Sequence, residues 1–315
     1  MLNQIAFYGA LESGLIYSLV AFSIYLSFRI LDFPDLTVEG TFPLGGAVAI
    51  VLIIHGFNPW LASLIAAMTG FVAGAVTGFL NVGLKIMHLL ASILVMYALY
   101  SINLRIMGRP NLPLGGRSSL LSALSDSAPN LHYALVPVVV FALIVLLVTA
   151  LLYLFMKSET GLAMRATGAN SRMARAQGIS TGAMIILGIA IANALAALAG
   201  AMFAQSRQAA DVGSGIGVLV IGLASLIGGE AVLNPKKVAT ALVACIIGSV
   251  LFRLIVAVAL ETMGDTLHLL PGDINLLTAI LMLIAIKFGS IREFFLNFYR
   301  HKFPVQRQKL RRKND

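Results

Sequence analysis

The sequence predicts an all-α polytopic membrane protein with about nine transmembrane helices. Of its 315 residues, 59% are hydrophobic and 11% are charged, whereas a soluble domain carries roughly 25% charged residues. The apolar residues gather into runs near the length of about 20 residues that a helix needs to cross a bilayer. We expect a single transmembrane domain over residues 1–315, because no hydrophilic stretch is long enough to hold a soluble domain.

The spans follow one another along the whole chain. The run 5–28 lacks the basic start and the small-residue cleavage site of a removable signal peptide, so it is expected to stay in the protein. The runs 42–54 and 213–227 are rich in glycine, and 276–288 is short. In order, the predicted spans are 5–28, 42–54, 60–80, 89–107, 136–156, 184–204, 213–227, 238–260 and 276–288.

The distribution of positive charge predicts the orientation. If the C-terminal tail is cytoplasmic and the spans alternate, most of the 22 Lys and Arg residues lie on the cytoplasmic side, including those of the basic tail 289–315. This asymmetry follows the positive-inside rule and places the N-terminus outside. The tail is expected to bind anionic membrane lipid rather than nucleic acid. The external side then holds Arg105, Arg109, Arg117, Arg207 and Arg253.

The segment 32–46 cannot form one regular helix, because it contains Pro34 and Pro43. Irregular backbone at membrane depth is tolerated only where protein or a water-filled cavity surrounds it. Two interpretations stay open. In the first, the segment is an ordinary cytoplasmic loop with its acids in water and with Asp32 paired to Arg29. In the second, it is a broken helix that lines a substrate path.

The second interpretation assigns candidate residues. If residues 36–39 form the first turn of a helix, Asp35 and Glu39 share a face one turn apart, and Thr37 and Thr41 share an adjacent face. Charges near the bilayer centre are costly, so such acids need water, a cation or a solute beside them. The predicted substrate-path residues are Asp35, Thr37, Glu39, Thr41 and Asn193.

Glycine recurs every fourth residue at Gly70, Gly74 and Gly78. In a membrane, such a stripe lets two helix backbones approach closely. Packing inside the chain is the expected use, with subunit dimerisation as the alternative. The alanine-rich stretch 190–201 is interpreted in the same way.

The cytoplasmic loop 157–182 is richer in basic and small residues than a simple connection requires. Asn170 or Ser171 can cap a helix N-terminus, and Gly178 suits the left-handed position after its end. We therefore expect a two-turn helix on the cytoplasmic membrane surface, where it can contact a partner protein.

The sequence offers no sign of an enzyme. No Lys follows a Gly, which excludes the usual phosphate-binding loop, and the five His residues lack metal-site spacing. Cys245 is the single cysteine, so no intramolecular disulfide forms. We expect no catalytic residue, metal or cofactor in this chain.

The cytoplasmic loop resembles the coupling helix of permease subunits in ABC importers of the branched-chain amino acid type. Its Gly-x-x-x-Arg-Ala-x-Gly-x-Asn pattern is followed by Ala-Leu-Ala-Gly at 197–200 and by Gly-Gly at 228–229. Segment 32–40 is more similar to the tryptophan/tyrosine-type subgroup. The residues that the resemblance and the adjacent basic positions assign to ATPase coupling are Gly161, Arg165, Ala166, Gly168, Asn170, Arg172, Ala174, Arg175 and Gly178.

The resemblance implies the fold of the vitamin B12 importer type without its first span, in a bacterial inner membrane. It also implies cytoplasmic ATPase subunits that bind the ATP, an extracytoplasmic substrate-binding protein, and a second permease copy, expected to form a homodimer. The solute would be an amino acid or related compound. The alternative is an ion-coupled secondary transporter with Asp35 and Glu39 as coupling acids. A cytoplasmic docking helix favours the importer, because ion coupling does not require one.

Overall fold

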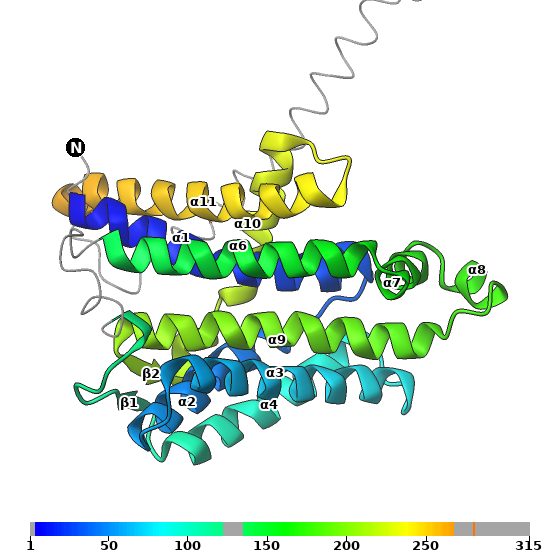
Figure 1. The fold of residues 1–315 in the computed structure, drawn as a ribbon, viewed down its shortest axis with the longest axis horizontal. Coiled ribbons are helices and arrows are strands. Elements are labelled where there is room, and N and C mark those ends of the chain that lie inside the picture. Colours follow the sequence, from blue (N-terminus) through cyan, green and yellow to red (C-terminus); the bar gives the residue numbers. More distant parts are fainter. Residues whose placement is uncertain (1–3, 122–134, 268–279, 281–315) are drawn as a thin grey trace, which may run out of the picture.

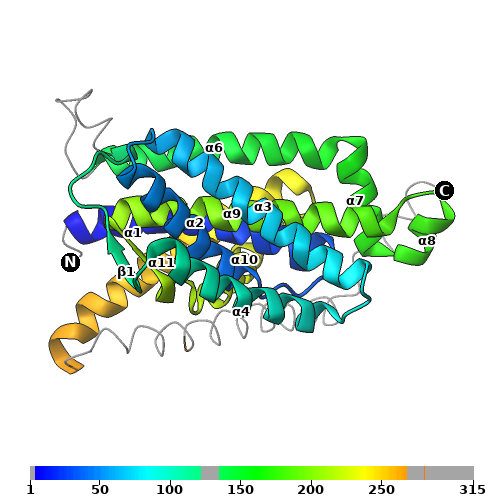
Figure 2. The ribbon, with the colours of Figure 1, turned by 90° about the horizontal axis from the view of Figure 1, so that it is seen from below.

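The computed structural model describes residues 4–121, 135–267 and 280, which form a bundle of helices with a small sheet at one end (Figures 1 and 2). The helices are α1 (Gln4–Ile24), the π-helix η1 (Tyr25–Ile30), α2 (Val38–Ile54), α3 (Pro59–Val82), α4 (His88–Met107), α6 (Leu135–Lys157), α7 (Glu159–Ala169), α8 (Ser171–Ala176), α9 (Thr181–Arg207), the 3₁₀ turn η2 (Val212–Gly215), α10 (Val218–Leu233) and α11 (Val238–Leu267). The strands are β1 (Asn111–Pro113) and β2 (Ala209–Asp211).

The helical membrane protein is confirmed, but the number nine is not. Within the described residues, seven helical segments are long and apolar enough to cross a membrane. Helix α2 is apolar but has only 17 residues, and the predicted span 276–288 and the basic tail lie outside the described residues. The seven segments are Ala6–Ile30, Pro59–Val82, His88–Met107, Leu135–Lys157, Thr181–Arg207, Val212–Leu233 and Val238–Glu261.

Helix α9 packs against α1, α2, α3 and α7. It approaches the glycine stripe of α3 closely. A Cβ atom at Gly74 would overlap the Ile189 carbonyl oxygen and lie 2.8 Å from the Asn193 Cβ. Gly70 and Gly78 meet α9 in the same way, which confirms that the stripe serves packing inside the chain.

Helix α2 is short but deeply enclosed. A Cβ at Gly45 would overlap the backbone of Ala197, and one at Gly200 would overlap the carbonyl group of Phe42. The alanine-rich stretch of α9 therefore also packs internally, as predicted. Helix α2 therefore packs between α3, α4 and α9.

The two ends of the bundle carry different structures. Strands β1 and β2 pair antiparallel, with Leu112 opposite Ala210. In Figures 1 and 2 this sheet lies at one end, while α7 and α8 lie at the other. The chain that leaves β2 passes through η2 into α10, so α10 begins inside the bundle and faces the start of α2.

Candidate functional site

The extended segment between η1 and α2 is anchored in the bundle by Asp35. One oxygen of its carboxylate accepts the Thr37 backbone N–H at 2.9 Å, and the other accepts the Asn193 side-chain amide at 2.7 Å. Asn193 lies near the middle of the 27-residue helix α9. All three side chains are fully buried. The segment therefore reaches well into the bundle, and its carboxylate has the partners that a buried acid needs.

Two threonines extend these contacts to neighbouring helices. The Thr41 hydroxyl donates to Asn193 Oδ1 at 2.9 Å, and the Thr37 and Thr77 hydroxyls lie 2.9 Å apart. All four side chains in these two contacts are fully buried. We call Asp35, Thr37, Thr41, Thr77 and Asn193 the Asp35 network. It includes four of the five predicted path residues, which contact one another and enclose no cavity among the described pockets.

Glu39, the fifth predicted path residue, has different partners. Helix α2 begins at Val38, so Asp35 belongs to extended chain and the two acids do not share a helical face. Glu39 Oε1 accepts the backbone N–H of Gly217 at 3.2 Å, and Gly217 is the N-cap residue of α10. The N-termini of α2 and α10 therefore meet at this carboxylate.

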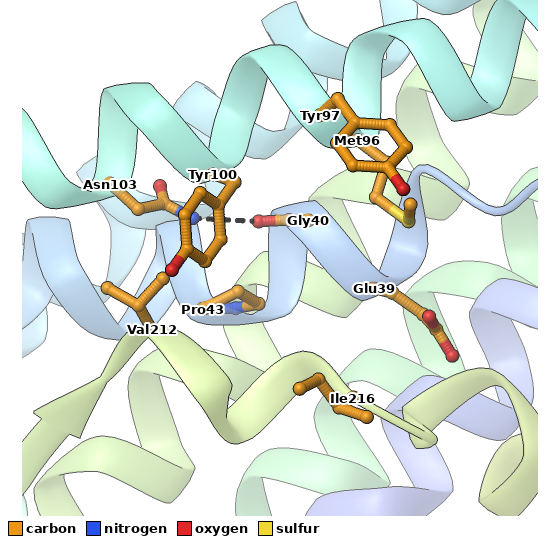
Figure 3. A pocket seen from close by; sticks show the side chains of 9 residues that line it. All are labelled: Glu39, Gly40, Pro43, Met96, Tyr97, Tyr100, Asn103, Val212 and Ile216. Carbon is orange, nitrogen blue, oxygen red and sulfur yellow. Dashed lines mark hydrogen bonds between the residues drawn. The ribbon is translucent and has the colours of Figure 1, made fainter. Parts of the chain in front are cut away.

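Glu39 also lines a cavity of about 230 Å³ (Figure 3). We call this cavity the Glu39 pocket. Helices α2 and α4 form two of its walls, and the turn before α10 forms the third. Its lining residues are Glu39, Gly40 and Pro43 of α2; Met96, Tyr97, Tyr100 and Asn103 of α4; and Val212 and Ile216 of the turn.

The α4 wall was missed by sequence reasoning. Tyr97 and Tyr100 are 69% and 55% exposed, and Asn103 is buried, with its Nδ2 donating to the Gly40 carbonyl oxygen at 3.2 Å. The positions of the two tyrosines could have indicated this wall, because tyrosines in transmembrane helices normally gather at the membrane interfaces. Tyr97 and Tyr100 instead lie near the centre of the 20-residue helix α4.

The ordinary-loop interpretation of segment 32–46 was wrong in its ion pair and in its exposure. Arg29 pairs with Glu230 of α10 rather than with Asp32, through two hydrogen bonds of 2.9 and 2.8 Å. Asp32 is exposed and has a positive φ of 54°. Phe33 is buried, as are Asp35 and Thr37. Only the start of the segment is therefore solvent-exposed.

The predicted surface helix is present and is preceded by a longer one. Helices α7 and α8 are separated at Asn170, whose Oδ1 accepts the N–H groups of Arg172 and Met173 at 3.1 and 3.0 Å. Gly178 has a φ of +83°. The predicted N-cap and the predicted left-handed glycine are thus both confirmed.

The residues predicted for ATPase coupling divide into packed and exposed groups. Gly161 and Ala174 are buried, and a Cβ at Gly168 would overlap the Ile30 carbonyl oxygen. The packed residues position α7 and α8 against the bundle. Met173, which was not predicted, is 62% exposed. The exposed predicted residues are Arg165, Asn170, Arg172, Arg175 and Gly178, while Ala166 and Gly168 are half-buried.

Comparison with known proteins identifies the family of this chain. A family model described as the permease component of branched-chain amino acid transport systems matches residues 7–286. A tyrosine transport system permease protein of Clostridioides difficile is 35% identical over 281 residues, which cover 89% of this chain and 90% of the relative.

More distant relatives have other solutes in their names. A fructose import permease protein of Bifidobacterium longum is 28% identical and covers 67% of this chain and 61% of its own length. Among solved structures, a transporter described as an ABC transporter of the metal-chelate type, in an inward-facing conformation, aligns with a TM-score of 0.50 at 13% identity. This alignment covers 91% of this chain and 85% of that chain, and it supports the fold alone.

Proposed function

The chain belongs to the branched-chain amino acid transport system permease component family, and from this premise we propose that it is the permease subunit of an ABC importer for an aromatic amino acid. The family makes it a permease component for a small solute. The aromatic solute is supported by the tyrosine permease, which is more similar to this chain than the fructose permease and matches it over a longer stretch.

The energy source in this proposal is ATP bound by separate cytoplasmic subunits. The main support is α8, a short capped helix whose Arg172, Met173 and Arg175 side chains are exposed. A helix with one exposed apolar residue between two cations fits a groove on a partner protein. Movement of this helix would pass through α7 to η1, against whose last residue Gly168 packs. ATP-driven closure of the partners would then shift the permease between outward-open and inward-open states.

The remaining partners complete the importer. Two permease copies would enclose the path, and an extracytoplasmic binding protein would deliver the solute at the β1–β2 end of the bundle. In a bacterial inner membrane, this places the N-terminus outside and the C-terminus in the cytoplasm. This orientation is supported by the surplus of Lys and Arg in the segments that it places on the same side of the membrane as α7 and α8.

We predict that Ser118 and Ser171 lie on opposite sides of the membrane. Single cysteines at these positions, in a Cys245→Ala background, should react with a membrane-impermeant maleimide from opposite sides of the membrane. Ser118→Cys should label in intact spheroplasts, because Ser118 is exposed in the loop after β1. Ser171→Cys, at the start of α8, should label only after permeabilisation. Labelling of both cysteines from one face would contradict the orientation.

The function itself is tested by uptake into proteoliposomes. The permease, its ATPase and its binding protein are reconstituted together, with radiolabelled L-tyrosine outside and ATP inside. We expect tyrosine to accumulate only with hydrolysable ATP, and fructose to remain outside. Accumulation driven by a proton or sodium gradient without ATP would instead favour a secondary transporter, and ATP-driven uptake of fructose alone would reject the amino acid.

A further inference from the structure

We infer that the Glu39 pocket is the site where the permease holds its solute in transit, and that it recognises a primary ammonium group attached to an apolar or aromatic body. This inference rests on the proposed function, because it gives the chemistry by which the permease path would recognise an aromatic amino acid. Four observations support it without any comparison with related proteins. They are the position of the pocket, its charge, one unpartnered amide oxygen and two aromatic rings.

The position of the pocket indicates that it faces a solute path and not the lipid. Tyr97 and Tyr100 lie near the centre of α4, with most of their surface exposed. The Glu39 carboxylate lies at the same level, because it shares the pocket with them (Figure 3). A carboxylate facing hydrocarbon at the centre of a bilayer is strongly disfavoured, so intramembrane acids normally face a bundle interior or a water-filled cavity. The pocket side of α4 therefore faces water or solute.

The charge of the pocket favours a cation. Glu39 is the only ionisable carboxylate among the nine lining residues, and none of the nine is Lys, Arg or His. The N-terminus of α10 is not free to bind an incoming anion, because its Gly217 N–H already donates to Glu39. Discontinuous helices that meet at mid-membrane bind ions and solutes in many transporters. Here the N-termini of α2 and α10 meet at Glu39, and the carboxylate makes this a site for positive charge.

Asn103 adds an acceptor that the described residues leave unused. Its Nδ2 donates to the Gly40 carbonyl oxygen at 3.2 Å, which fixes the orientation of the amide. Its Oδ1 is buried and accepts no hydrogen bond from the described residues. Leaving a buried acceptor unsatisfied costs about 1–3 kcal/mol. Because Oδ1 is buried, a small movement of the pocket wall is needed to bring it to a solute N–H. That contact would remove the cost and favour a hydrogen-bond donor.

The two tyrosines and Met96 complete the recognition. An ammonium group near the face of an aromatic ring is attracted by the electrons of the ring, and the rings also pack against an apolar body. The cavity of about 230 Å³ is smaller than the roughly 300–1,000 Å³ of typical drug-sized sites, so it fits a small solute or one end of a larger one. Since the lining offers no cationic side chain, the carboxylate of an amino acid would lie outside this pocket.

The test measures direct binding to the permease–ATPase complex in nanodiscs without the binding protein. The probes are L-tyrosine, tyramine, which has the ammonium but no carboxylate, and 3-(4-hydroxyphenyl)propionate, which has the carboxylate but no ammonium. We expect tyrosine and tyramine to compete for one site and the propionate not to compete. Glu39→Gln, which can still accept from Gly217, should weaken tyramine binding about tenfold to a hundredfold, as should Asn103→Leu.

Matched variants separate these contacts from structural effects. Asp32→Asn makes the same acid-to-amide change at an exposed site and should bind tyramine like the wild type. Tyr100→Leu, which removes the ring, should weaken binding about threefold to thirtyfold, and Tyr100→Phe, which keeps the ring, should bind tyramine more tightly than Tyr100→Leu. The inference is overturned if the propionate competes as well as tyramine, or if Glu39→Gln and Tyr100→Leu both bind tyramine normally. Failure of ATP-driven tyrosine uptake by the wild type, with these binding results intact, would instead reject the proposed function and leave the pocket standing.

Discussion

Met173→Asp is expected to abolish ATP-driven uptake while leaving the permease folded in the membrane. Met173 is 62% exposed on α8, between Arg172 and Arg175. The substitution places a charge where an apolar side chain would enter the groove of the ATPase. Loss of a central anchor in a protein interface typically costs at least 2 kcal/mol, so we expect ATPase binding to fall at least about thirtyfold. The measurements are co-purification of the ATPase and uptake in proteoliposomes.

The chain offers a closely matched control at Met87. Met87 is 65% exposed and is the N-cap residue of α4, in the loop between α3 and α4. Met87→Asp introduces the same charge and even a better N-cap residue. It should keep both ATPase binding and uptake. If Met173→Asp assembles with the ATPase and transports like the wild type, α8 is not the docking helix.

The structure also shows why α7 is a poorer place for this test. From the sequence alone, Gly168→Pro and Arg165→Glu are the natural variants, since both residues fall in the family pattern. Gly168, however, packs against the Ile30 carbonyl oxygen, so its replacement would disturb the fold of α7 and not only the docking surface. Arg165 is exposed, and Arg165→Glu remains interpretable.

The sequence was most informative where the signal is local. The N-cap of α8 depends on Asn170 and the amides two and three residues after it, and the approach of α3 to α9 depends on glycine every fourth residue. Both are set by a few consecutive positions, so residue type and spacing suffice to predict them. The same holds for the long apolar runs, because the hydrocarbon thickness fixes their length.

Contacts between distant segments could not be predicted in this way. The loop interpretation paired Arg29 with the nearby Asp32, but the fold brings Glu230 to it from another helix. Asp35 and Glu39 were expected on one face because the helix start was placed two residues too early. The N-cap residue before α2, Thr37, donates its backbone N–H to Asp35, and Asp35 itself lies in the extended chain before the helix. The position of a helix start inside a protein depends on such partners, which an isolated pattern does not contain.

The second large effect is expected from Asp35→Asn, which should lower the stability of the protein. The amide can keep one oxygen on the Thr37 N–H, but its NH₂ group then faces the NH₂ group of Asn193. Two buried donors are left without an acceptor between them, at a cost of about 1–3 kcal/mol. We expect a lower midpoint of thermal unfolding in detergent. Asp32→Asn is the matched control, and it should leave the midpoint unchanged, because Asp32 is exposed and Asn tolerates its positive φ.

Exchanging the two groups tests the hydrogen bond itself. In the double variant Asp35→Asn with Asn193→Asp, the amide at 35 can donate to the carboxylate at 193, and Thr41 can still donate to that carboxylate. The rescue should be partial, because the Ile189 carbonyl oxygen loses the donor that Asn193 supplies at 3.0 Å. A double variant as unstable as the sum of the two single variants would show that the pair does not interact. An Asp35→Asn protein as stable as Asp32→Asn would show that the Asp35 network does not hold the segment in place, and that α2 is positioned by its glycine contacts with α9 alone.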